Sequence, residues 1–181
     1  GAPDLARRIR AMVEAAGLPV AEDATRGFDH GAWVPLAIAW PHADIPLIQL
    51  SIDSRRPAAF HRALGRVLAP LRDDGVLIVG SGSMTHNQRY FAQNRPAIDA
   101  PVPDWVRGFV DWVAERAAAG DAGSLDDLMA LAPHAHDNHP TPDHILPFFA
   151  AMGAGGEVLA AERLHHSYSY GVLAMDAYAF H

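Results

Sequence analysis

Apolar positions recur along the chain at helical spacing, and short, continuously apolar runs separate these stretches. The spacing predicts helices over five segments: residues 3–16, 57–75, 104–119, 124–131 and 141–153. Pro70 is expected to kink the second helix, because proline removes a backbone donor and clashes with the preceding turn. In the last helix Thr141 is a suitable N-cap and Pro142 suits the first helical position.

Two short apolar runs predict buried strands. They are IPLIQLSI over 45–52 and VLIVG over 76–80, and the tail over 167–180 also has strand-like character. A helical crossover joins the two buried strands, which favours parallel pairing. We therefore predict an α/β fold with a three-layer arrangement, in which a mostly parallel or mixed central sheet carries helices on both faces. The length of 181 residues and the absence of a linker predict a single domain over 1–181.

Composition narrows the classes of function. The chain has 14 basic and 21 acidic residues, a formal net charge of −7, and every basic residue is an arginine. The arginines form no stripe that could neutralise phosphates, so nucleic acid is not expected as a partner. No apolar run is long enough for a membrane span and the start lacks a hydrophobic leader, so we expect a cytoplasmic protein without a membrane partner. The absence of cysteine excludes a disulfide scaffold and a cysteine nucleophile.

Eleven histidines are the main candidates for chemistry. His86 lies in SGSMTHN, directly after the predicted strand over 76–80, where ligands bind in open α/β sheets. His144 is expected in the first turn of the last helix, where the helix dipole favours a neutral, metal-binding imidazole. Each could instead be structural, since a buried histidine often serves only as a hydrogen-bonding group. His139 could support such a site.

The remaining histidines are weaker candidates. His30 follows Asp29 in a loop between aromatic residues, and His42 and His61 are expected at the surface. No pair has the HExxH spacing of a helical zinc protease, and no G-x-S-x-G nucleophile elbow is present. A metal-dependent hydrolase has no motif of its own here, and a serine hydrolase is weakly supported.

Four segments together resemble a known family. GFDHGAWVPL, IPLIQLSID, VLIVGSGSMTHN and HPTPDHILPFFAAMGA are similar to segments of the extradiol aromatic ring-opening dioxygenases of the DOPA-dioxygenase type, in the class III extradiol superfamily. The similarity runs in order along the whole chain. It implies a single non-haem metal, Fe(II) in the working enzyme or Zn(II) in isolated protein. The implied substrates are a small aromatic diol and O₂, and the ring is cut beside the diol.

The resemblance also implies roles for three residues. His144 matches a metal ligand of the family. His86 matches a histidine that is either an acid/base beside the substrate or a further metal ligand. His30 matches a pocket histidine that binds the catechol or oxygen and takes part in catalysis.

One feature departs from the family pattern. Family members carry a GHGSP-like and a SAHW-like motif, each with a metal-ligand histidine, and neither motif occurs in this chain. Because a metal site of this type needs about three protein ligands, we expect this chain alone not to be a competent dioxygenase. The alternatives are a portion of a longer protein, a subunit completed by another copy or another chain, and a non-catalytic domain of the same fold that binds a ligand or protein.

Overall fold

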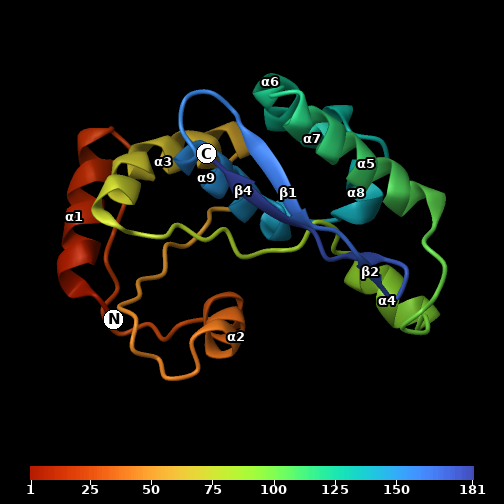
Figure 1. Ribbon diagram of the computed structural model, residues 1–181, viewed down its shortest axis with the longest axis horizontal. Helices are drawn as coiled ribbons and strands as arrows, with labels where there is room; N and C mark the ends of the chain where they lie inside the picture. The colour runs from red at the N-terminus through yellow and green to blue at the C-terminus, as the bar shows by residue number, and fades with distance from the viewer. The chain divides into compact units, whose positions relative to one another are not determined.

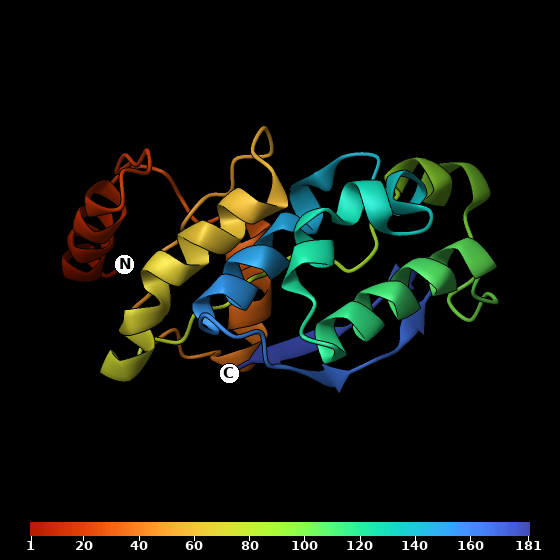
Figure 2. The ribbon, with the colours of Figure 1, turned by 90° about the horizontal axis from the view of Figure 1, so that it is seen from above.

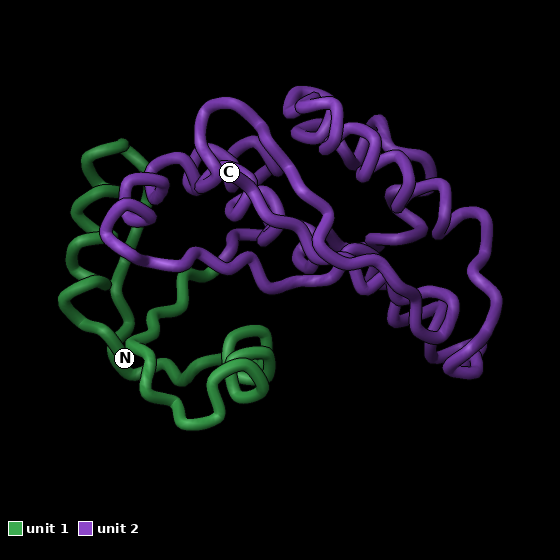
Figure 3. Tube along the Cα trace, viewed as in Figure 1, with its two compact units in different colours: residues 1–51 green, residues 52–181 purple.

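The computed structural model describes residues 1–181, and it forms two compact units. The first unit contains residues 1–51 and the second contains residues 52–181 (Figure 3). No helix in the structure combines the length and apolar character needed to cross a membrane.

The first unit contains two helices. Helix α1 spans Pro3–Ala15, which confirms the first predicted helix, and it buries Ile9 and Val13. Helix α2 spans His30–Ala39 and begins at an Asp29 N-cap, whose side chain accepts a hydrogen bond from the backbone N–H of Ala32. The backbone N–H and carboxylate of Asp29 also bond the side chain of Gln49, at 2.9 Å in each case. These bonds hold the start of α2 against the chain before residue 50.

Helices are the main regular structure of the second unit (Figure 1). Their bounds are α3 Ala58–Leu68, the 3-10 helix η1 Ala69–Asp74, α4 Gln88–Asn94, α5 Asp104–Ala118, α6 Ala122–Asp126, α7 Leu128–Leu131, α8 Ala135–Asn138, the 3-10 helix η2 Pro142–His144, and α9 Leu146–Ala154. The predicted kink at Pro70 is confirmed, because α3 stops at Leu68 and the chain continues as η1. The core gathers around Phe109 of α5 and Phe149 of α9, both fully buried.

Helices α3 and α9 lie side by side (Figures 1 and 2). Their backbones touch where two glycines face the opposite helix. A Cβ added to Gly65 would lie 2.0 Å from the carbonyl oxygen of Ala150, and one added to Gly153 would lie 2.0 Å from that of Arg62. Neither oxygen can move as a side chain does, so the crossing requires glycine at both positions.

Three of the four strands lie in the tail over 167–180, as predicted, and β1 precedes it. They are β1 Ala161–His165, β2 Tyr168–Ser169, β3 Leu173–Ala174 and β4 Ala177–Phe180. Strand β1 pairs with β4 and β2 pairs with β3, both antiparallel, so each sheet has two strands. The mixture of helices and strands agrees with the prediction, whereas the three-layer arrangement around a mostly parallel sheet is not confirmed.

The two predicted buried strands are extended but form no ladder. Backbone hydrogen bonds hold Val76 to Leu71 and Ser83 to His144, and residues 77–82 between them make none. Leu77 is 70% exposed and Val79 58% exposed, although a continuous apolar run is typical of a strand buried on both faces. The prediction of two buried strands was therefore wrong, because a strand needs a neighbouring strand to pair with, and the apolar pattern does not specify one.

Candidate active site

The imidazoles of His86 and His144 lie face to face. Their ring centroids are 3.5 Å apart and their planes differ by 11°. His86 follows the extended segment over 76–83, and His144 ends η2. Both residues are half-buried. The fold thus joins two histidines that are far apart in the sequence.

Backbone contacts hold the two histidine segments together. The N–H of Ser83 donates to the carbonyl oxygen of His144 at 2.9 Å. A Cβ at Gly82 would lie 2.2 Å from that same oxygen, so only glycine allows the chain to pass this close. Gly82 thus permits close contact with the backbone of the segment that carries the other histidine.

Thr85 ties the same segment to the C-terminal strands. Its buried Oγ1 donates to the carbonyl oxygen of Val172 and accepts from the N–H of Ala174, at 2.8 Å in each case. On the other side the N–H of His86 donates to the carbonyl oxygen of Asn138 at 2.9 Å. The residues on both sides of the Thr85–His86 peptide are therefore fixed by bonds to distant parts of the fold.

The position of His144 differs from the prediction. Thr141 stands before η2, its side chain makes no capping bond to the backbone, and α9 begins only at Leu146. His144 therefore lies in a short 3-10 turn rather than in the first turn of an α-helix. The dipole argument for a neutral His144 does not apply, because three residues of 3-10 helix have little aligned dipole.

Burial affects the protonation of the histidine pair. It lowers the pKa of His86 below the usual histidine value, and the neighbouring His144 lowers that pKa further. The buried Nδ1 of His144 lies 2.9 Å from Oδ2 of Asp143, but not in hydrogen-bonding geometry, so this nitrogen has no hydrogen-bond partner. His86 is therefore neutral near pH 7 and able to accept a proton, and His144 has an unpartnered nitrogen.

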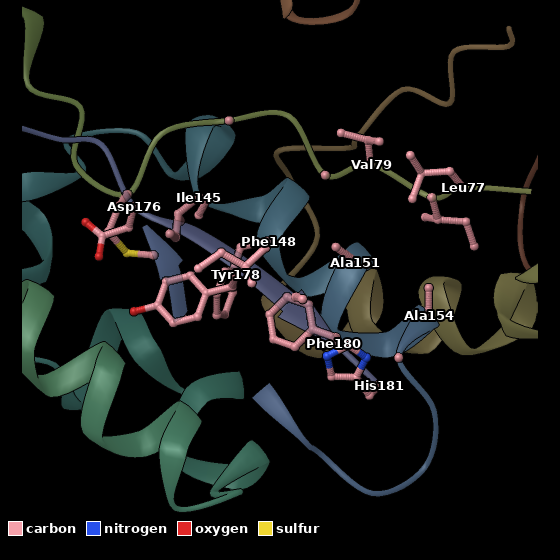
Figure 4. Close-up of a pocket in the computed structure, with 18 of the residues that line it drawn as sticks. Leu77, Val79, Ile145, Phe148, Ala151, Ala154, Asp176, Tyr178, Phe180 and His181 are labelled. Atoms are coloured by element: carbon pink, nitrogen blue, oxygen red, sulfur yellow. The ribbon is translucent and has the colours of Figure 1, made fainter. Parts of the chain in front are cut away.

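His144 also lines a cavity of about 580 Å³. The segment over 76–84, helix α9 and strand β4 line this open cavity (Figure 4). Its walls are mainly apolar, with Phe148 and Ala151 from α9 and Phe180 from β4. An aromatic ring would find apolar contacts there, and His144 adds a polar group.

His30 lies in the first unit, exposed at the first position of α2. The stacked pair lies in the second unit. The preceding Asp29 bonds Gln49 and caps the helix. The structure thus brings His86 and His144 together within the second unit, whereas His30 belongs to the first unit.

Two other histidines are fully buried. His61, expected at the surface, has Nδ1 3.0 Å from the carbonyl oxygen of Pro57, and its Nε2 accepts from the N–H of Asp53 at 3.2 Å. The surface prediction for His61 was wrong, because both ring nitrogens find backbone partners. His139 is buried as well, with Nε2 2.9 Å from the carbonyl oxygen of Met84. Its place five residues before His144, in the family-like segment HPTPDH, was the sequence signal for a role near the site.

Comparison with known proteins decides the family. The model of the LigB family, described as the catalytic LigB subunit of aromatic ring-opening dioxygenase, matches residues 1–181. The chain belongs to this family. It is 40% identical over 181 residues to a 4,5-DOPA dioxygenase extradiol of Beta vulgaris, a match that covers 99% of this chain and 66% of that protein.

Two further matches agree with this family assignment. A 4,5-DOPA dioxygenase extradiol of Escherichia coli K12 is 38% identical over 157 residues, covering 85% of this chain and 56% of the relative. The crystal structure of an uncharacterized E. coli K12 protein superposes with a TM-score of 0.77 at 33% identity, covering 98% of this chain and 72% of the other. The chain spans 66% of the length of the Beta vulgaris and Portulaca grandiflora relatives.

The family resemblance implies a metal, and the two site histidines fit part of a metal site. Imidazole is a common ligand of iron and zinc, and the unpartnered Nδ1 of His144 is a buried nitrogen without another role. A site needs about three protein ligands, and the structure has no group of three or more histidine, aspartate or glutamate side chains placed to hold an ion. His86 and His144 would supply two donors once the rings turn out of the stack, because lone pairs in nearly parallel ring planes 3.5 Å apart do not meet at one ion.

Lowering the pH is expected to destabilise the fold through His139. Burial lowers the pKa of His139 to about 4, against about 6.5 in an unfolded chain. The unfolded state binds the proton more readily than the folded state. The contribution of neutral His139 to the free energy of unfolding is therefore fully present above about pH 6.5 and is lost as the pH drops toward 4. The loss from this residue is about 3 kcal/mol. Urea unfolding across this range would measure it.

The control for this pH dependence is His139→Gln, whose side chain cannot titrate but keeps an amide N–H near the position of Nε2. The variant should lose less stability than the wild type between pH 7 and 4, because its side chain takes up no proton. Equal pH dependence in both proteins would contradict the assignment. His136→Gln, at an exposed position, should behave as the wild type.

Proposed function

We propose that this chain contributes to the active site of a non-haem-metal-dependent extradiol dioxygenase that cleaves a catechol-type aromatic. The observation that carries the proposal is the stacked pair of His86 and His144, with His144 lining an apolar cavity in a chain of the LigB family. The relatives from Beta vulgaris and Escherichia coli are named as 4,5-DOPA dioxygenases. We therefore take a dihydroxyphenyl ring as the substrate class, with O₂ as the second substrate.

His144 would hold the metal through a ring nitrogen. His86 would either add a second ring nitrogen or serve as the acid/base, because the single lone pair of a neutral imidazole cannot do both. The remaining ligands would come from elsewhere in the working protein. A ferrous ion held there would activate the diol and O₂ toward each other. The cavity beside His144 would receive the aromatic ring against Phe148 and Phe180 and keep water away from it.

His86 would act as the acid/base. Burial keeps its imidazole neutral near pH 7, as a general base requires. The ring can accept a proton from a substrate hydroxyl and return it as the ring opens. Whether His86 acts in this way or only as a ligand is a question of metal content, which a variant can answer.

We assign His30 to substrate binding and catalysis, as a hydrogen-bonding group for the diol or oxygen. Its exposed position at the start of α2 leaves the imidazole free to meet a ligand. The bonds between Asp29 and Gln49 support the assignment, because they fix the backbone next to His30.

Anaerobic reconstitution with Fe(II) of the working protein, in which a further ligand completes the metal site, tests the proposal. Oxygen consumption is then measured with DOPA and simple catechols. We expect one O₂ consumed for each catechol and a coloured ring-opened product. Metal-replete protein that consumes no O₂ with any catechol would refute a catalytic role and favour a non-catalytic, ligand-binding domain of the same fold. Native mass measured in parallel would show whether a second copy or another chain is needed.

A further inference from the structure

His139 is the one buried side chain that bonds the backbone leading into His86. Its side chain is 0% exposed, and its ring packs against Phe109 of α5 with centroids 5.4 Å apart. Nε2 lies 2.9 Å from the carbonyl oxygen of Met84, two residues before His86. A carbonyl oxygen only accepts, so Nε2 carries the proton and the ring is the Nε2–H tautomer.

Backbone hydrogen bonds next to the His139–Met84 contact hold the segment that carries His86. The residue before His139 accepts the N–H of His86 at 2.9 Å through its backbone oxygen. Residues 138 and 139 therefore hold both sides of Thr85, one through the backbone and one through a side chain. Five residues later the same segment carries His144, whose backbone oxygen accepts the N–H of Ser83. The two site histidines thus share one short frame, in which His139 makes the only side-chain bond to Met84.

We propose that His139 is a positioning residue that holds the His86 ring against His144. Its bond lies in the protein interior, where a hydrogen bond is stronger than in water and a lost partner is costly. Without the donor, the buried carbonyl of Met84 would be unsatisfied and the backbone would shift to find water. A small shift would be enough to separate two rings stacked at 3.5 Å. A catalytic use for this arrangement rests on the proposed function, but the arrangement itself can be tested without any activity.

The test compares two substitutions that differ in reach. His139→Gln places an amide N–H near the position of Nε2 and keeps the bond, whereas the shorter side chain in His139→Asn cannot reach Met84. Protein with isotopically labelled histidine is examined by NMR for the contact between the His86 and His144 ring protons and for the upfield shifts that stacking causes. We expect both signals in the wild type, in His139→Gln and in the exposed control His136→Gln. In His139→Asn we expect both to be lost.

A folded His139→Asn protein with unchanged ring contacts and shifts would overturn the proposal. If that variant does not fold, the nitrogen chemical shifts of His139 in the wild type decide: an Nε2–H tautomer supports the proposal and an Nδ1–H tautomer overturns it. Failure of the proposed function looks different, because the wild type would then show stacked rings and no oxygen consumption.

Discussion

Replacing His86 with glutamine is expected to lower catechol-dependent oxygen consumption by about 10²- to 10⁴-fold, the usual contribution of a general acid/base. Glutamine keeps a polar side chain of similar length but cannot exchange a proton near pH 7. Burial prepares the imidazole for this role by lowering its pKa, so that the neutral form predominates. Steady-state rates from an oxygen electrode, at saturating catechol and Fe(II), provide the measurement.

Metal content separates the two roles proposed for His86. A variant that keeps its iron but loses the rate identifies an acid/base, whereas a variant that loses iron as well identifies a ligand. The exposed His136→Gln serves as the control and should keep both. A His86→Gln protein with an unchanged rate would remove His86 from the active site.

Replacing Gly65 with alanine is expected to destabilise the second unit by about 3 kcal/mol, at the upper end of the usual cost of overpacking. The added methyl group would lie 2.0 Å from the Ala150 carbonyl oxygen, a backbone atom of α9, so the two helices must move apart to admit it. Alanine's higher helix propensity, worth about 1 kcal/mol over glycine, offsets only part of this loss. Urea unfolding followed by circular dichroism would show the midpoint falling.

Gly108→Ala is the matched control. Gly108 lies inside α5, and a Cβ there would meet nothing within 4 Å. That variant should be as stable as the wild type or more stable by up to about 1 kcal/mol. Equal unfolding midpoints for Gly65→Ala and Gly108→Ala would mean that α3 and α9 do not touch as described.

Much of the local structure could be predicted from the sequence. Apolar spacing located α1, α3, α5 and α9, and Pro70 marked the end of α3, because these signals act between residues a few positions apart. The same locality explains the errors. His144 was assigned to an α-helical first turn on the strength of Thr141 and Pro142, but the chain forms a 3-10 turn there and starts the helix later.

The sequence by itself determined the alternation of helices and extended segments, the acidic surface charge, and the motifs that single out His30, His86 and His144. Only the tertiary structure decided that the rings of His86 and His144 stack, that His61 and His139 are buried, and that the sheets pair antiparallel. The reason is physical: helical spacing and proline breaks depend on neighbours along the chain. A ring contact, a buried hydrogen bond or a strand pair depends on a partner that packing brings from a distant position.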